Sequence, residues 1–161
     1  MNKQAGFTLI ELVVVIVILG LLAAAALPKF INVTTDARIA SLNGVAGGLR
    51  TAASLARAEY VVTGTNTATT VTMDASTVNV LDEATNAGRG GRPTGANGGI
   101  GDDGTLVAPA GGAMPDPDGY NVTYPGGIAT YRPASGGSAT CQVEYTAAAL
   151  SDPVVVTSTG C

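Results

Sequence analysis

The residue with the most distinctive chemical setting is Glu11, a carboxylate inside an apolar segment near the N-terminus. Gly6 and Phe7 precede it, and residues 12–27 carry no charged or polar side chain. An unpaired ionised side chain costs at least ~2.5–3.5 kcal/mol at bilayer depth, so this carboxylate calls for a cationic partner. Lys3 lies beyond Gly6, and Lys29 lies at the far end of the apolar segment. The sequence therefore predicts a partner that processing creates or another subunit supplies.

This carboxylate lies in a segment long enough to cross a membrane as a helix. From residue 7 to residue 27 the only polar side chains are Thr8 and Glu11, and about 20 residues span a hydrocarbon core as a helix. Residues 13–18 are all β-branched, but in lipid the backbone must satisfy its own hydrogen bonds, so we expect a helix. Lys3 places the N-terminus in the cytoplasm and predicts export of the remaining chain.

Two residues weaken this helix. Pro28 lacks an N–H and clashes with the carbonyl of Ala24, four residues back. Gly20 costs up to ~1 kcal/mol relative to alanine. We expect the stretch between them to kink or unwind locally. The alternative is a continuous helix that Pro28 merely kinks.

Beyond Pro28, apolar residues recur every three or four positions, which predicts an amphipathic helix over residues 31–60. The stripe consists of Ile39, Leu42, Val45 or Ala46, Leu49, Ala53, Ala56 and Tyr60. A continuous helix over residues 7–60 would be ~80 Å long at 1.5 Å per residue. A small domain cannot bury that length, so lipid or other subunits must cover about half of it.

Residues 61–161 have a different composition, rich in Thr, Ala, Gly and Asn, and residues 88–137 hold most of the 22 glycines and 8 prolines. We expect residues 88–137 to form a long loop laid over the surface, with short strands inside it. Residues 120–124 and 128–132 flank Pro-Gly-Gly, which predicts a hairpin. Strands are also expected around residues 141–145 and 154–157. The predicted fold is α+β: a long N-terminal helix packed on a small antiparallel sheet.

The two cysteines, Cys141 and Cys161, are too few for a structural zinc site. In an exported domain such a pair predicts one disulfide, and the alternative is two free thiols. The bond would stabilise the C-terminus by roughly 3 kcal/mol in the chain-entropy model.

The remaining sequence offers little catalytic chemistry. The chain has no histidine, so a serine-type triad and the usual metal ligand are missing. Residues 99–104 match G-x-G-x-x-G, but no clear strand precedes them and two aspartates would repel a phosphate. Asp116-Pro-Asp118-Gly119 reads better as a turn than as a calcium loop, because its glycine comes too early. The net charge of −4 and dispersed basic residues argue against nucleic acid. We expect no enzyme activity, no cofactor and no metal.

The N-terminal residues carry a family resemblance. Residues 6–12, Gly-Phe-Thr-Leu-Ile-Glu-Leu, followed by Val, Ile and Leu, resemble the N-terminal signature of type IV pilins and the related type II secretion pseudopilins. Residues 28–33, with Asp-Ala-Arg at 36–38, further resemble the mannose-sensitive haemagglutinin type of pilin, and the tail from Cys141 to Cys161 looks like the same group. The resemblance implies a pilin fold with a leader (1–6), a hydrophobic helix (7–30), an amphipathic helix (31–60) and a β-rich head (61–161).

The resemblance also implies a mechanism. A membrane prepilin peptidase would cut between Gly6 and Phe7, and the new Phe7 amine would be N-methylated, which keeps its charge. Glu11 would then pair with the Phe7 amine of a neighbouring subunit. The helices would pack in the centre of a helical filament of identical subunits, with the heads outside. The resemblance also implies local unwinding of this helix. Filament pilins of the family show an unwound stretch between positions that match Gly20 and Pro28.

These implications define the expected life of the chain. The precursor would lie in the bacterial inner membrane, meet the peptidase and the pilus assembly machinery, and end in an extracellular filament for adhesion, motility or surface attachment. The alternative within the same mechanism is a type II secretion pseudopilin or minor pilin. An alternative of another class is a secreted enzyme or binding module whose signal peptide is removed after Ala26.

Overall fold

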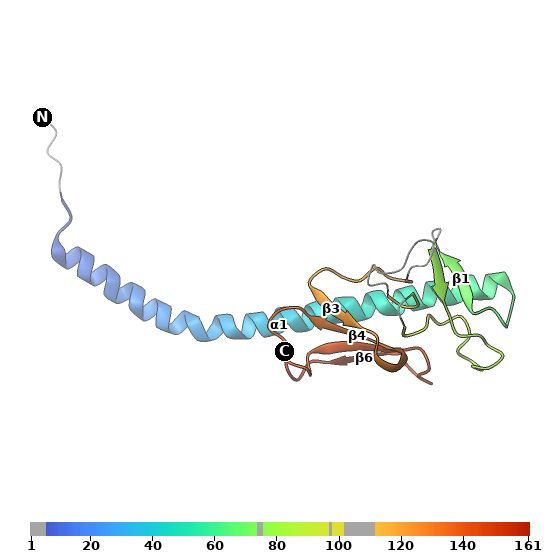
Figure 1. Ribbon diagram of the computed structural model, residues 1–161. Helices are drawn as coiled ribbons and strands as arrows, with labels where there is room; N and C mark the ends of the chain where they lie inside the picture. Colours follow the sequence, from blue (N-terminus) through green and yellow to red (C-terminus); the bar gives the residue numbers. More distant parts are fainter. Residues whose placement is uncertain (1–5, 74–75, 97, 102–111) are drawn as a thin grey trace, which may run out of the picture. The chain divides into compact units, whose positions relative to one another are not determined.

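The structure is a computed structural model that describes residues 6–73, 76–96, 98–101 and 112–161, without the side chains of residues 27–32. In these residues one long helix, α1 (Leu9–Thr63), precedes six strands and a short 3-10 helix (Figure 1). The chain divides into two compact units, with the boundary inside α1 between Ala37 and Arg38.

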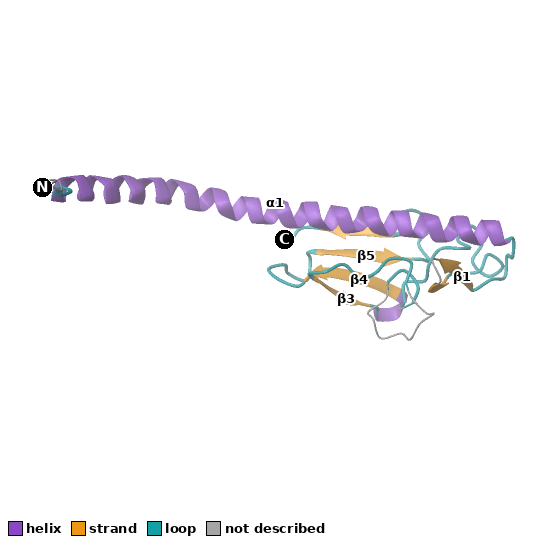
Figure 2. Ribbon diagram, turned by 90° about the horizontal axis from the view of Figure 1, so that it is seen from above, coloured by secondary structure: helices purple, strands orange, loops and turns teal. Residues whose placement is uncertain are grey.

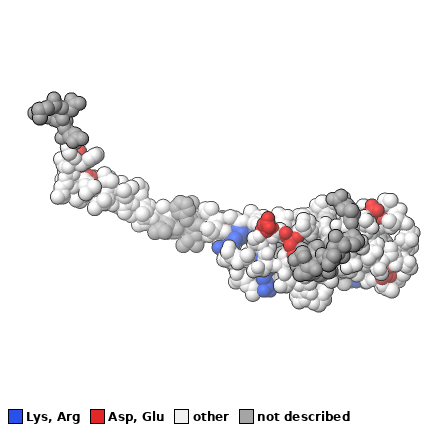
Figure 3. Space-filling view, turned by 45° about the horizontal axis from the view of Figure 1, so that its top comes forward, with Lys and Arg blue, Asp and Glu red and all other residues white. Residues whose placement is uncertain are grey.

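The N-terminal unit consists largely of the first half of α1. Its segment Leu9–Ala26 has a mean hydropathy of 2.9 and no buried residue, and by length and composition it could cross a membrane. Residues 12–26 add no charge to its surface (Figure 3). The helix assignment continues through Gly20 and Pro28, and the predicted unwinding between them stays a prediction.

In the C-terminal unit, the second half of α1 lies along the strands and buries one stripe of side chains (Figure 2). Leu42 and Leu49 are fully buried, and smaller residues between and beyond them complete the stripe. The predicted amphipathic stripe is confirmed, since its buried members include Ala46, Ala53, Ala56 and Tyr60. Alanine at most of these positions lets the helix approach its neighbours closely.

A four-stranded antiparallel sheet has the order β3-β4-β5-β6. Strands β3 (Tyr120–Thr123) and β4 (Ile128–Pro133) form the predicted hairpin around the 3-10 turn η1 (Pro125–Gly127), where Gly126 and Gly127 have positive φ. Strands β5 (Gln142–Thr146) and β6 (Val154–Thr157) follow and pair antiparallel. Alternation buries every second residue of β5, so the strands predicted from the sequence are confirmed.

The inner face of this sheet supplies the largest side chains of the main core. Tyr131 on β4 lies opposite Val143 on β5, and both are fully buried, as is Tyr145. They pack with Leu42 and Leu49 of α1 in one cluster. The α+β arrangement of a long helix and a small antiparallel sheet is therefore the observed fold.

A second sheet was not predicted. Strands β1 (Thr70–Met73) and β2 (Ser76–Asn79) pair antiparallel, with Val71 opposite Val78. These two valines are buried against Ala56 and Tyr60 near the end of α1. The sheet gives the last turns of the helix their own small core.

The glycine-rich segment before β3 differs from the prediction of a loop laid over the surface. Gly91, Pro93, Gly95 and residues 98–101 are buried, and Ile100 is fully buried in the main core. The reason is close approach: a Cβ at Gly91 would lie 2.5 Å from Cβ of Tyr60. Glycine is used here to bring backbone against the core.

The C-terminus is held by the predicted disulfide. Cys141 and Cys161 are bonded, with their Cα atoms 4.9 Å apart. The Arg38 guanidinium donates a hydrogen bond of 3.0 Å to the Cys161 carbonyl. The last residue is therefore tied both to Cys141, directly before β5, and to Arg38 of α1.

Candidate functional site

The N-terminal end of α1 is organised by Thr8 and Glu11. The Glu11 carboxylate accepts hydrogen bonds from the Thr8 backbone N–H at 2.8 Å and from the Thr8 hydroxyl at 2.7 Å. In return, the Glu11 N–H donates to the Thr8 hydroxyl oxygen at 3.4 Å. This reciprocal arrangement at a helix start is a capping box, which satisfies N–H groups that have no partner within the helix.

Sequence analysis missed this cap. It looked for a basic partner of Glu11 and did not consider a neutral partner within the chain. The signal was present as Thr8-Leu-Ile-Glu11 directly before an apolar run, the T-x-x-E pattern of a helix start. The carboxylate therefore has a hydrogen-bonded position in the single chain, where the Thr8 groups that donate to it are neutral.

The predicted cleavage residues lie just outside the helix. Gly6 and Phe7 are exposed and precede α1, which begins at Leu9. Phe7 is 92% exposed, and a Cβ placed on Gly6 would meet no atom within 4 Å. The peptide bond between them is thus in an exposed, non-helical segment.

The helix surface beside Glu11 is apolar and uncovered. Glu11 lines a shallow surface hollow together with the apolar residues Phe7, Ile10, Val14 and Val15. Ile10 is 70% exposed, and large apolar residues continue along α1 to Leu22. An apolar surface of this extent marks contact with lipid or protein.

The C-terminal unit carries the other polar clusters. Asp82 accepts hydrogen bonds from the Thr85 N–H and hydroxyl, which lower the pKa of its carboxyl. Glu83 accepts from the N–H groups of Gly88 and Gly90, which likewise lower the pKa of that carboxyl. Both residues shape the loop after β2 and have structural rather than catalytic surroundings.

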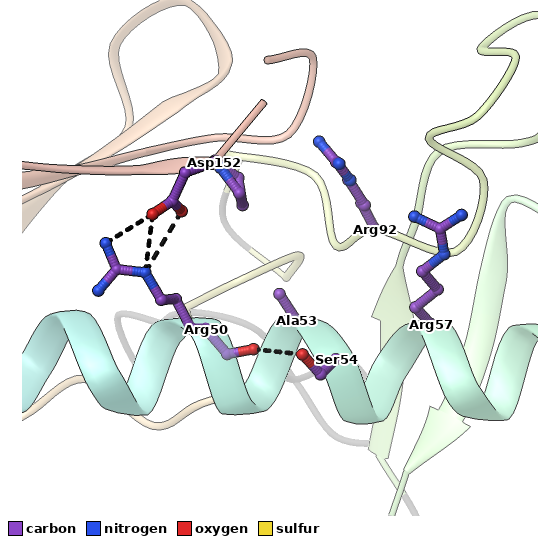
Figure 4. Close-up of a pocket in the computed structure, with 7 residues that line it drawn as sticks. Arg50, Ala53, Ser54, Arg57, Arg92 and Asp152 are labelled. Atoms are coloured by element: carbon purple, nitrogen blue, oxygen red, sulfur yellow. Dashed lines mark hydrogen bonds and ion pairs between the residues drawn. The ribbon is translucent and has the colours of Figure 1, made fainter. Parts of the chain in front are cut away.

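Arg50 and Asp152 form an ion pair at 2.7 Å between α1 and the segment before β6 (Figure 4). Hydrogen bonds from Arg50, and then from the Val154 N–H, hold the pKa of Asp152 below its usual value. Sequence analysis did not find this pair. Its members are 102 positions apart in the chain, and no local pattern connects them.

Two motifs were rejected as binding sites on the sequence alone. The described residues include part of the first motif and all of the second. Gly99 and Gly101 are buried beside the core, while residues 102–104 of the G-x-G-x-x-G pattern lie outside the described residues. Asp116, which precedes β3, accepts hydrogen bonds from the hydroxyl of Tyr124, the residue directly after β3, at 3.1 and 3.2 Å. In the described parts of the chain, no group of three His, Cys, Asp or Glu side chains is placed to hold a metal ion.

Two fully buried tyrosines, Tyr131 and Tyr145, lie in the sheet core. Burial raises the pKa of Tyr145, whose hydroxyl donates a hydrogen bond to the Pro93 carbonyl. Burial also raises the pKa of Tyr131. Both hydroxyls stay protonated in the physiological range and act as core groups.

An exposed apolar helix with a capped start, followed by a small α+β unit, is a pilin-like arrangement. Residues 1–27 match the model of the prokaryotic N-terminal methylation motif. The matched residues include the predicted cleavage residues and Glu11. The motif, the fold and the relatives below support a type IV pilin.

The chain is similar to named pilus proteins. It is 44% identical over 54 residues to the type IV narrow pilus major component PilA5 of Thermus thermophilus, covering 34% of this chain and 47% of that protein. It is 47% identical over 57 residues to a fimbrial protein of Moraxella nonliquefaciens, covering 35% and 37%. It is 43% identical over 51 residues to the type IV major fimbrial protein FimA of Dichelobacter nodosus, covering 32% and 33%.

These matches span less than half of each relative, and no solved structure matches the chain. The finer likeness to the mannose-sensitive haemagglutinin type stays a prediction, because these relatives carry other names.

Proposed function

We propose that this chain is the structural subunit of a type IV pilus filament. The observation that carries the proposal is the exposed apolar segment Leu9–Ala26, headed by the Thr8–Glu11 cap within the matched methylation motif. A segment with no buried residue needs lipid in the precursor and neighbouring helices in the filament. The names of the similar proteins support the same role.

In this proposal the peptidase cuts between Gly6 and Phe7, and the Phe7 amine is methylated. The cut would leave the helix cap intact. The Thr8 N–H that donates to Glu11 belongs to the Phe7–Thr8 peptide bond, which is not the bond that is cut. Glu11 would then hold its place on the helix and accept a charged partner at the same time. The partner would be the Phe7 amine of a neighbouring subunit. If this pair is buried, removal of one member would destabilise the assembly by ~3–5 kcal/mol.

Location and partners follow from the same steps. The precursor would be held in the inner membrane by residues 7–30 and would pass to the prepilin peptidase and the pilus assembly machinery. The head of residues 61–161 would face outward in a homopolymeric filament used for adhesion, motility or surface attachment. We propose no enzyme activity and no cofactor for the subunit.

A type II secretion pseudopilin or minor pilin would share the N-terminal mechanism. The relatives named as major pilus components favour the major subunit. The two roles differ in abundance: a major pilin forms most of the filament mass, whereas a minor pilin is present in few copies.

The test is to isolate surface filaments, image them by electron microscopy and determine the mature N-terminus by mass spectrometry. We expect filaments made mainly of this chain that begin at N-methylated Phe7. A mature chain that begins at Leu27 would contradict the proposal and favour a secreted module with a discarded signal peptide. Presence as a trace component would favour the minor pilin.

A further inference from the structure

A pocket on the C-terminal unit gathers positive charge. Its wall includes three arginines, Arg50 and Arg57 on α1 and Arg92 on the loop before β3, with Asp152 and Pro153 opposite them. The pocket has a volume of about 290 Å³. The chain has 8 basic against 12 acidic residues, so three of its eight cations surround this one hollow. Like charges repel, and a cluster of this kind needs compensating anions.

Helix geometry places two of these cations together. Arg50 and Arg57 are seven residues apart, close to two full turns, so they lie on the same side of α1. Figure 4 shows both side chains on that side, with Arg92 between them in this view. The three arginines thus come from two separate elements and line one pocket.

Among the described residues that line the pocket, Asp152 is the one anion beside three cations. Two nitrogens of Arg50, Nε and Nη2, donate hydrogen bonds to the same carboxylate oxygen of Asp152, at 3.0 and 2.7 Å. Arg92 donates a hydrogen bond to the Ala149 carbonyl at 2.6 Å, a neutral acceptor, and its charge is attracted to Asp152, the carboxylate that Arg50 already binds. Arg57 is exposed and makes no hydrogen bond or ion pair with any described residue. It is attracted to Glu83, but that carboxylate is already bonded to two backbone N–H groups.

We propose that this pocket binds a tetrahedral oxyanion, a phosphate or sulfate group. Guanidinium groups bind such anions through several charge-assisted hydrogen bonds. Here donors reach the space from α1 and from the Arg92 loop, so they suit an anion whose oxygens point in several directions. The Arg50–Asp152 contact already shows an anionic oxygen group at the edge of the space. The apolar surface of Ala53 and Pro153 completes the wall.

Nuclear magnetic resonance of the arginine side chains tests this proposal on the full chain. The chain has only six arginines, so the Nε–Hε signals of 15N-arginine-labelled protein in alkyl maltoside micelles can be followed individually. Inorganic phosphate, sulfate, acetate and glucose 6-phosphate are titrated at constant ionic strength. We expect saturable shifts of Arg50, Arg57 and Arg92 with phosphate and sulfate, and weaker binding of acetate.

The ester distinguishes the source of the group. Tighter binding of glucose 6-phosphate supports a group carried on a larger molecule, and equal binding supports a free ion. Non-saturating shifts of all six arginines, or tighter binding of acetate, would overturn the proposal.

Variants assign the effect to the pocket. Arg57→Gln should weaken phosphate binding about tenfold, since it removes one charge-assisted contact. Arg132→Gln is the matched control, because Arg132 is also exposed but lies on β4 and bonds Gln142. It should leave the affinity unchanged. Asp152→Asn should tighten binding, because it removes the internal competitor for Arg50. Equal affinities in wild type, Arg57→Gln and Asp152→Asn would rule out this site.

Discussion

Glu11 is bound by Thr8 within its own chain, and in the proposed filament it also faces the amine of a neighbour. These two roles can be separated by side-chain chemistry. Glutamine occupies the same position of a capping box as well as glutamate does, but it carries no charge. The cap and the ion pair therefore respond differently to substitution.

Glu11→Gln should keep the helix cap and lose the intersubunit pair. We expect the precursor to be inserted in the membrane and cut after Gly6, while filaments are absent or rare. Immunoblotting measures processing, and electron microscopy counts the filaments. Filaments at wild-type abundance would contradict the charge-pair role.

Thr8→Ala is the matched variant, because it removes the hydroxyl of the cap and keeps the Glu11 charge. Loss of an N-cap side chain costs ~1 kcal/mol of helix stability. Filaments should still form, with lower thermal stability than those of wild type. If Thr8→Ala abolished assembly as completely as Glu11→Gln, the two roles would not be separable.

Asp152 gives the C-terminal unit an acid-sensitive contact. The pKa of its carboxyl is lowered in the folded state, chiefly by Arg50. Its contribution to stability is therefore fully present above the unfolded value of about 3.9 and is lost as the pH falls through the lower folded value. The two side chains are 46% and 51% exposed, so the pair contributes at most ~1 kcal/mol.

Asp152→Asn should accordingly lower stability at pH 7 only slightly and remove part of the loss seen in acid. Urea unfolding at pH 7 and at pH 3 measures both effects. The difference between variant and wild type should shrink at pH 3. A difference that grows in acid would show that the sign of the pKa shift is wrong.

Among the elements, those with a strong periodic signal were predictable from the sequence. The stripe from Leu42 to Tyr60 and the alternation of β5 each repeat with the period of their element. Strands β1 and β2 escaped prediction because each has four residues with a single buried valine, too short a run for alternation to show. The buried glycine segment escaped because glycine composition signals a loop whether or not the core covers it.

The helix stripe predicts a contrast between two leucines of α1. Leu49 is fully buried in the main core, whereas Leu55 is 56% exposed. Leu49→Ala should destabilise the C-terminal unit by ~2–5 kcal/mol. Leu55→Ala, the same chemical change on the same helix, should stay within about 0.5 kcal/mol. Chemical denaturation of both variants measures the difference, and similar values for the two would contradict the assigned packing face.

Two glycines of one loop allow the cost of backbone strain to be measured apart from the cost of a close contact. Gly88 and Gly91 both have positive φ, at 77° and 76°. A Cβ would meet no atom within 4 Å at Gly88, but it would lie 2.5 Å from Tyr60 at Gly91. Gly88→Ala should cost ~1–2 kcal/mol for the left-handed backbone alone. Gly91→Ala should cost clearly more by the same unfolding measurement, and equal costs would mean that the contact with Tyr60 is easily relieved.

At the scale of the whole molecule, contacts between distant segments could be predicted only where residue type restricted the choice. The chain has two cysteines, so a single pairing was possible. The Arg50–Asp152 pair and the arginine pocket depend on how α1 meets the loops before β3 and β6. With six arginines and many acidic residues, the sequence alone gives no reason to choose these partners.

The disulfide joins two cysteines of the head that are 20 positions apart in the chain. In the chain-entropy model a loop of this length stabilises the fold by about 3 kcal/mol. Reduction should therefore lower the unfolding midpoint of the full chain in micelles, and Arg38 should lose its ordered acceptor, the Cys161 carbonyl. Thermal unfolding with and without reductant measures the loss. The double variant Cys141→Ser, Cys161→Ser is the control: it should unfold at the lower midpoint under both conditions, since it has no bond to reduce. If the unfolding midpoint of the wild type were the same with and without reductant, the bond would not contribute to the stability of the head.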